Sequence, residues 1–140
     1  MTLLDSSTEF GRRAERRLRD EKLAWLTTVD GAGTPQPIPV WFLWDGADSV
    51  LIYSRPGTPK LRAIASRPRV ALNLDGDGSG GDIVVALGEA ALSDDPPAHE
   101  LPDYVEKYLP LIERNGWTPE SFAADYSVPI RVTLGRVRGH

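Results

Sequence analysis

Three prolines alternate along one stretch of the chain and restrict where that stretch can lie in a fold. Pro35, Pro37 and Pro39 are two residues apart within residues 34–44, which otherwise have the pattern of a strand. Proline has no backbone N–H group, and residues two apart in a strand direct their N–H groups to the same side. One side of this strand therefore lacks hydrogen-bond donors. We expect this half of the strand to lie at the edge of a sheet or to be irregular.

The five residues that follow the prolines are apolar on both faces of the strand. Residues 40–44 read VWFLW, and successive side chains of a strand point to opposite faces. Both faces therefore need a cover. We expect the hydrophobic core to cover one face, and either a partner subunit or a flat ring to cover the other.

The remaining patterns predict a small antiparallel barrel with helices inserted between its strands. Apolar alternation predicts about six strands, at residues 23–29, 34–44, 49–54, 69–75, 82–92 and 129–138. Helical spacing predicts helices at residues 7–20 and 58–66 and a helical region at 97–126. Strands that follow one another without repeating βαβ units favour a mainly β (α+β) fold. We expect residues 1–140 to form a single domain.

A basic turn stands out in this acidic protein. Residues 53–69 contain five cations and no acidic residue, although the whole chain has a net charge of -4. A strand ends near Ser54, Gly57 allows a tight turn, Thr58 suits a helix N-cap and Pro59 suits the first helical position. A helix start beside fixed cations is a seat for a phosphate. The alternative is a well-capped surface helix with solvated arginines.

The residue types exclude several kinds of catalysis. The chain has no cysteine, and its only histidines are His99 and His140. Thiolate nucleophiles are thus excluded, while a histidine triad or a multi-histidine metal site is not expected. No catalytic side chain can be named and no metal site is predicted. Hydride or electron transfer by a bound cofactor fits this composition.

Charge and hydropathy also restrict the partners. No run approaches the ~20 apolar residues of a membrane span, and no signal peptide is evident, so we expect a cytoplasmic protein. The arginines of residues 12–19 are diluted by acidic neighbours, so a solvated helix face is favoured over a nucleic-acid surface. A cofactor pocket would occupy much of so small an interior. This favours a homo-oligomer with its sites at the subunit boundary.

Four segments together resemble a known family. In order they are residues 24–30 (AWLTTVD), 37–46 (PIPVWFLWDG), 54–62 (SRPGTPKLR) and 67–72 (RPRVAL), with a weaker similarity at 126–132. Their order and spacing resemble the pyridoxamine 5'-phosphate oxidase-like superfamily of FMN-binding split β-barrels. Within it the chain is most similar to the actinobacterial branch that uses the deazaflavin coenzyme F420. The resemblance implies a homodimer with two identical sites at the subunit interface.

The resemblance also implies which residues hold the phosphate of a flavin or deazaflavin. Arg55, Thr58 and Lys60 match the family's phosphate-binding positions. Pro59 belongs to the same helix start, and Ser54 flanks the pocket. Arginine would supply a planar fork and lysine a point charge.

The ring of the cofactor is implied to lie against the proline-rich strand. Pro39, Val40, Trp41 and Phe42 match the segment whose backbone lines the ring, and Asn73 on a neighbouring strand is a further candidate. For Trp41, a role as a core aromatic residue is the alternative to direct ring contact.

These features predict an oxidoreductase that binds F420 and transfers a hydride to a small organic substrate. The alternatives are an FMN-dependent flavoprotein related to pyridoxamine-phosphate oxidases, and a non-catalytic flavin- or deazaflavin-binding protein. Arg62, Arg67 and Arg69 would extend the basic strip for an acidic cofactor tail, which favours F420. Substrate-phosphate residues of true pyridoxamine-phosphate oxidases are not found. We expect the helical region 97–126 to cover the barrel end, with shaping of the substrate pocket as the alternative.

Overall fold

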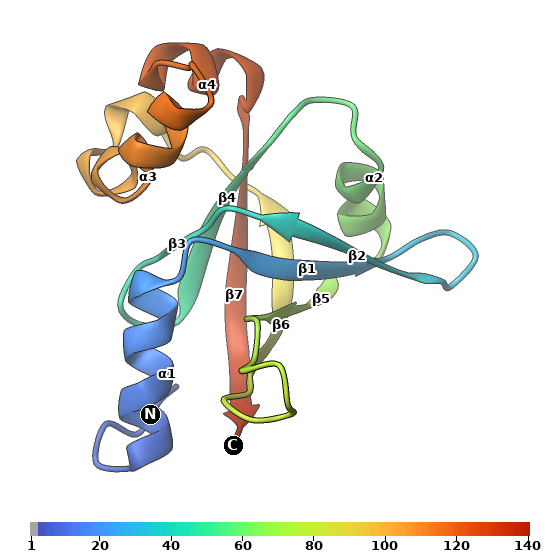
Figure 1. Ribbon diagram of the computed structural model, residues 1–140. Helices are drawn as coiled ribbons and strands as arrows, with labels where there is room; N and C mark the ends of the chain where they lie inside the picture. Colours follow the sequence, from blue (N-terminus) through green and yellow to red (C-terminus); the bar gives the residue numbers. More distant parts are fainter. Residues whose placement is uncertain (1–2) are drawn as a thin grey trace.

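The computed structural model describes residues 3–140, in which seven strands form one fully antiparallel sheet (Figure 1). The order of the strands across the sheet is β2-β1-β5-β6-β7-β4-β3. The predicted antiparallel split barrel is thereby confirmed, with one more strand than expected. The strands are β1 (Ala24–Val29), β2 (Pro35–Val40), β3 (Leu43–Trp44), β4 (Ser49–Ser54), β5 (Arg69–Asn73), β6 (Val84–Leu92) and β7 (Val128–Gly139).

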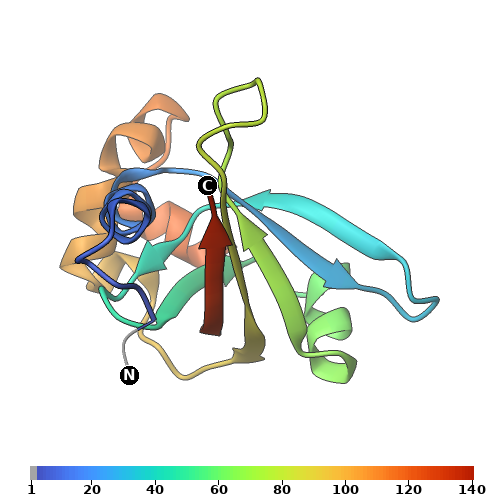
Figure 2. The same cartoon turned by 90° about the horizontal axis from the view of Figure 1, so that it is seen from below.

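The proline-rich strand β2 lies at an edge of the sheet, as predicted. It pairs only with β1, in a register that places Pro35 opposite Val29 and Pro39 opposite Trp25. The other side of β2 has no neighbouring strand, so the missing N–H groups cost no ladder hydrogen bond. The β1–β2 hairpin projects from the rest of the sheet in both views (Figure 1, Figure 2).

The predicted strand at residues 34–44 is interrupted, and the interruption curls the sheet. β2 and β3 form opposite edges of the sheet, yet only Trp41 and Phe42 separate them in the chain. The two edges must therefore approach each other, which makes an open barrel. At the break, the N–H of Phe42 donates to the Tyr108 hydroxyl (2.8 Å), and Lys107 Nζ donates to the Phe42 carbonyl (2.8 Å). Side chains of the helical region replace the strand ladder there.

The long strands β6 and β7 also bend to close the barrel. Their register shifts between Leu87 and Gly88, which is a β-bulge. A Cβ on Gly88 would lie 2.3 Å from the Thr133 carbonyl oxygen, so only glycine fits at this crossing.

The helices have the expected places, with small shifts at their starts. α1 (Glu9–Asp20) begins after Thr8, whose hydroxyl accepts from Gly11 N–H at 2.9 Å, instead of at residue 7. α2 (Pro59–Ser66) follows the basic turn. The region 97–126 contains a 3-10 turn η1 (Ala98–Glu100), α3 (Pro102–Arg114) and α4 (Pro119–Asp125).

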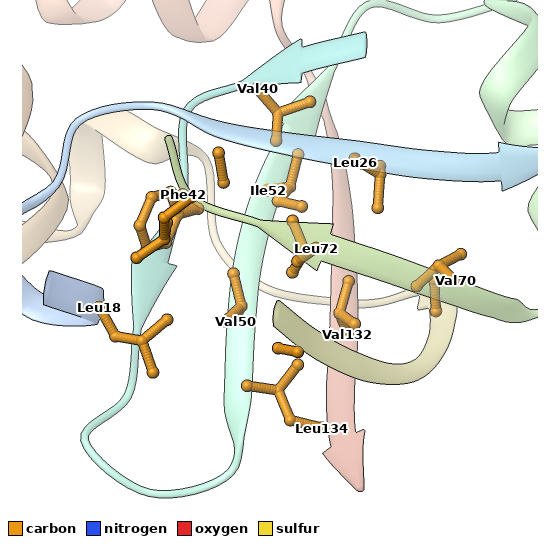
Figure 3. Packing of buried hydrophobic residues seen from close by; sticks show 14 of the residues in the cluster. Leu18, Leu26, Val40, Phe42, Val50, Ile52, Val70, Leu72, Val132 and Leu134 are labelled. Carbon is orange, nitrogen blue, oxygen red and sulfur yellow. The ribbon is translucent and has the colours of Figure 1, made fainter. Parts of the chain in front are cut away.

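Two hydrophobic clusters fill the molecule. The first lies inside the barrel and contains residues such as Leu26, Phe42, Ile52, Leu72 and Val132 (Figure 3). The second lies between β4 and the α3–α4 segment, with the buried members Leu51, Tyr53, Ala98, Tyr104, Tyr108, Ile112, Phe122 and Ala123. Trp41 and Leu43 pack against this second cluster. The chain itself therefore covers one face of residues 40–44 fully and the other in part, since Trp41 and Leu43 remain half-exposed. The expected partner or flat ring on that face stays a prediction.

One face of the sheet has no covering layer within residues 3–140. The residues that alternate with the buried ones on β1, β5 and β6 are only half-buried, and most are apolar: Trp25, Thr27, Val29, Ala71, Asn73, Val85 and Leu87. Within the described residues no helix is long and apolar enough to cross a membrane.

Candidate functional site

The basic turn joins β4 to α2 as the sequence predicts, but its capping is different. Ser54 ends β4 and is almost fully buried, and Gly57 has a φ of 75°, a left-handed conformation that glycine adopts without strain. Thr58 stands at the N-cap but makes no side-chain capping bond. Its hydroxyl lies 3.0 Å from Ser54 Oγ instead. The first turn of α2 is thus left without a side-chain acceptor for its N–H groups.

Lys60, in the first turn of α2, is a half-buried amine without a counter-charge. Within residues 3–140 no carboxylate forms an ion pair with it. Burial lowers the pKa of Lys60 below its usual value, because a desolvated ammonium group is unfavourable. An anion placed beside Lys60 would offset this cost. Lys60 is therefore the residue of the basic turn best suited to bind a phosphate.

Lys60 stands between two hollows of the surface. The first, which we call the α2 groove, has a volume of about 480 Å³ and lies between α2 and the β1–β2 hairpin. Its lining residues are Thr28, Asp30, Gln36, Ile38, Thr58, Pro59, Lys60 and Ala63. Asp30 is the one carboxylate among them, and hydrogen bonds from the Thr34 N–H and the Gln36 amide hold its pKa below the usual value. These donors keep Asp30 ionised, so the groove has one anionic group, on the β1–β2 hairpin, and one cationic group, Lys60 on α2.

The second hollow, which we call the aromatic hollow, has a volume of about 320 Å³. It is lined by Leu23, Pro39, Val40, Trp41, Tyr53, Lys60, Asn115, Trp117, Phe122 and Tyr126. The barrel therefore supplies one wall, from the end of β2 and from β4, and the α3–α4 segment supplies the other. Figure 1 shows α3 and α4 together on one side of the end of β4, with α2 on the other side. Lys60 is the residue that the two hollows share.

Trp41 belongs to a stacked group of aromatic rings. Its ring lies 4.7 Å from that of Tyr108 at an angle of 4°, and 5.2 Å from that of Phe122 at an angle of 17°. Because neighbouring aromatic side chains already stack on this indole, packing is one of its roles. The half-exposed remainder of Trp41 lines the aromatic hollow.

Some of the other predicted site residues line one of the two hollows, and the rest lie at the surface, in the barrel core or on the uncovered face of the sheet. Pro39, Val40 and Lys60 line the aromatic hollow, and Thr58 and Pro59 line the α2 groove. Arg55 is exposed, and its guanidinium lies over the ring of Tyr126, 5.1 Å from the ring centre. It therefore reaches the rim of the aromatic hollow through Tyr126.

Besides Arg55, three predicted residues line neither hollow. Ser54 is 1% exposed, and its hydroxyl lies against that of Thr58. Phe42 is only 1% exposed and its side chain lies in the barrel core, because the Tyr108 hydroxyl and Lys107 hold its backbone at the β2–β3 break. Asn73 lies on the uncovered face of the sheet, next to Trp25 in the β1–β5 register. Its amide N–H groups face the Leu74 carbonyl at 3.4 Å.

Sequence reasoning gave pocket shaping only as the alternative role of residues 97–126, and it named none of the residues by which the α3–α4 segment lines the aromatic hollow. We expected residues 97–126 mainly to cover the barrel end, and they do cover it through the second hydrophobic cluster. They also line the aromatic hollow with Asn115, Trp117, Phe122 and Tyr126. One sequence feature could have indicated this contribution. Trp117 directly follows Gly116, which ends the helix, so this large aromatic side chain lies outside the apolar stripe of the helix.

Comparison with known proteins agrees with this architecture. The family model for pyridoxamine 5'-phosphate oxidase matches residues 10–139, which is nearly the whole chain. The search of the curated proteins found no match.

Solved structures share the fold over most of its length. An F420 reductase is 26% identical, with a TM-score of 0.64, and the match covers 89% of this chain and 94% of that protein. The general stress protein 26 of Bacillus anthracis is 16% identical, with a TM-score of 0.68 and coverages of 90% and 89%. The heme storage protein HutZ of Vibrio cholerae is 14% identical, with a TM-score of 0.60 and coverages of 89% and 90%. The family model matches nearly the whole chain, and the sheet is curled and antiparallel. This chain therefore belongs to the pyridoxamine 5'-phosphate oxidase family of split β-barrel proteins.

Proposed function

We propose that this protein is an oxidoreductase that binds the deazaflavin coenzyme F420 and transfers a hydride from it to a small organic substrate. The observation that carries the proposal is Lys60, a half-buried cation without a carboxylate partner among the described residues, placed where the α2 groove meets the aromatic hollow. A phosphate seat that opens onto an aromatic wall suits a ligand with a charged end and a flat ring.

The roles of the chain's own residues follow from their places. Lys60 and the N–H groups at the start of α2 would hold the phosphate, with Thr58 beside them and Arg55 at the rim. Pro39 and Val40 would set the plane of the ring. When bound, the cofactor supplies the hydride, so the protein needs mainly to position the two reactants and to exclude water. The lining of the aromatic hollow accordingly contains no histidine and no carboxylate.

The choice of F420 over FMN depends on the cations beyond the phosphate seat. Arg62, Arg67 and Arg69 are exposed, and none of them forms an ion pair within residues 3–140. They extend the positive charge of the turn, which suits the long acidic tail of F420 better than the short monoester of FMN. The similarity to an F420 reductase supports the same choice. FMN is the second candidate, because the same seat fits a phosphate monoester.

We further propose that the active form is a homodimer with its sites at the subunit interface. The uncovered face of β1, β5 and β6, with Val29, Ala71 and Leu87 among its half-exposed residues, is the surface that would meet the second copy. Light scattering during gel filtration should give twice the mass of the chain. The change Leu87→Asp should give the mass of a single chain, and a monomeric wild-type protein would contradict the proposal.

The test of the cofactor is a pair of titrations of the purified protein with F420 and with FMN. Trp41 and Trp117 line the aromatic hollow, so bound cofactor should quench tryptophan fluorescence. We expect F420 to bind more tightly than FMN, and tighter binding of FMN would select the flavoprotein. Reduced F420 should then be oxidised in the presence of unsaturated acceptors. Tight binding of F420 without any oxidation across the acceptor panel would contradict the enzyme and identify a cofactor-binding protein.

A further inference from the structure

The α3–α4 segment forms an aromatic wall opposite the strand that is proposed to hold the cofactor ring. Its contributions to the aromatic hollow are Asn115, Trp117, Phe122 and Tyr126. We infer that this wall is the acceptor subsite, and that it takes a flat, uncharged, conjugated molecule of one or two rings. This inference rests on the proposed function, because it names the substrate class of the same site.

The charges of the lining select an uncharged acceptor. The lining contains no carboxylate, and its one charged side chain is Lys60. Aromatic rings can attract a cation, but the Lys60 ammonium at the same hollow would repel it. An anionic molecule would compete for Lys60 with the phosphate of the cofactor. A molecule without charge meets neither obstacle.

The arrangement of the rings selects a flat molecule. Phe122 and Tyr126 are stacked, with their centres 4.8 Å apart at an angle of 11°, and Phe122 is also stacked on Trp41. Trp117 is tilted by 53° from Trp41 and by 45° from Tyr126. These rings hold one another in place, so the wall is formed before the acceptor arrives, and aromatic pairs favour stacked or edge-to-face contact.

The size of the hollow limits the acceptor to a small molecule. Its volume of about 320 Å³ lies at the lower end of the range for small-molecule sites. Asn115 donates one amide N–H to the Leu111 carbonyl at 2.8 Å, which fixes the side chain at the end of α3. Its amide oxygen and second N–H make no hydrogen bond within residues 3–140. They are suited to a hydroxyl or carbonyl group on the acceptor.

A series of naphthalene derivatives tests the charge selection with one ring system. The probes are 1-naphthol, 1-naphthylmethylammonium and naphthalene-1-sulfonate, each titrated by calorimetry into the full-length protein with and without saturating cofactor. We expect 1-naphthol to bind in both conditions. The ammonium should bind at least about tenfold more weakly, because its charge has no partner in the hollow. The sulfonate should bind only without cofactor. Equal affinity for the ammonium and for 1-naphthol would overturn the inference.

Paired tryptophan variants test the location. Trp117→Ala should weaken 1-naphthol binding by about tenfold, the order expected for losing an aromatic contact. Trp44→Ala is the matched control, because Trp44 is also a half-buried tryptophan but lies outside the aromatic hollow. It should change the affinity less than about twofold. If Trp117→Ala does not fold, nuclear Overhauser contacts between 1-naphthol and the Trp117 indole of the wild-type protein replace it, and their absence overturns the subsite.

The outcomes separate this inference from the proposed function. Binding of F420 or FMN without 1-naphthol contact at Trp117 overturns the acceptor subsite and leaves the oxidoreductase standing. Binding of 1-naphthol at Trp117 without binding of either cofactor overturns the oxidoreductase, while the aromatic hollow remains a site for flat, uncharged ligands.

Discussion

The start of α2 and the α3–α4 segment line the same aromatic hollow, through Lys60 on one side and Trp117, Phe122 and Tyr126 on the other, but are built in opposite ways. α2 buries only Ile64, has no side-chain cap and presents cations to solvent. The α3–α4 segment buries Tyr104, Tyr108 and Phe122 in a cluster of aromatic rings, and α4 has a reciprocal cap between Thr118 and Ser121. In the proposed site, α2 would therefore supply charge for binding, and the more deeply packed α3–α4 segment would supply shape.

The largest expected effect is on the rigid side of this comparison. Phe122 is 4% exposed and stacks on Trp41 and Tyr126. Phe122→Ala should lower the free energy of unfolding by about 3–5 kcal/mol, because it leaves a cavity among the rings. Urea unfolding followed by circular dichroism measures this. Leu61→Ala, a half-buried position of α2, should cost clearly less. Equal losses in the two helices would remove the contrast between them.

A smaller loss is expected from one hydroxyl group. The Tyr108 hydroxyl accepts the Phe42 N–H at 2.8 Å and lies 2.8 Å from the Lys22 carbonyl, to which it can donate. Tyr108→Phe should lower the free energy of unfolding by about 1–3 kcal/mol, because buried backbone groups lose their partner. Tyr126→Phe is the control, since the Tyr126 hydroxyl makes no hydrogen bond within residues 3–140. If both variants unfold at the same urea concentration, Tyr108 does not hold the β2–β3 break.

On the α2 side the expected effect is on binding instead of stability. Lys60→Ala should weaken cofactor binding by about 1–3 kcal/mol, the range for losing a charge-assisted hydrogen bond. The free energy of unfolding should not fall, because the change removes a half-buried charge without a partner. Calorimetry with F420 measures the first quantity and urea unfolding the second. Arg16→Ala, at an exposed position of α1 outside both hollows, should retain most of the affinity. Unchanged affinity in Lys60→Ala would show that the phosphate binds elsewhere.

The smallest effect concerns the pH dependence of stability and depends on Lys107, a second half-buried amine. Burial lowers the pKa of Lys107 on α3 to about 8 from 10.5, even though its amine donates to the Phe42 carbonyl. Between these values the unfolded chain binds more protons than the folded protein, so stability should rise with pH from about 8 toward 10.5 and be lost as pH falls through about 8.

The contribution of Lys107 can be isolated by comparing the wild type with Lys107→Met. The free energy of unfolding of each is measured between pH 7.5 and 9.5. That interval lies below the titration of tyrosines in the unfolded chain at about 10, which acts in the opposite direction because burial raises the pKa of Tyr53 to about 12. We expect a flatter pH profile in Lys107→Met. Parallel profiles would show that Lys107 does not titrate in this interval.

The parts of the fold that were predictable depend on rules that act within a few residues. Missing N–H groups on alternate prolines place β2 at an edge in any sheet, and Thr118-Pro119 starts a helix by its local geometry. Five cations within residues 53–69 likewise mark a basic turn by their residue types alone. The break at Trp41 and Phe42 was not predictable, because the groups that bond to Phe42 lie 65 and 66 residues further along the chain.

The sequence by itself therefore determined the edge strand, the helix starts at Pro59 and Pro119, and the charged half of the candidate site. Tertiary structure alone decided that Phe42 turns into the core, that Asn73 lies on the uncovered face, and that Trp117 and Phe122 face the strand end. The physical reason is the separation in sequence of the residues that set each property. Backbone donors and local charge are properties of neighbouring residues, whereas an aromatic wall exists only after distant segments have packed together.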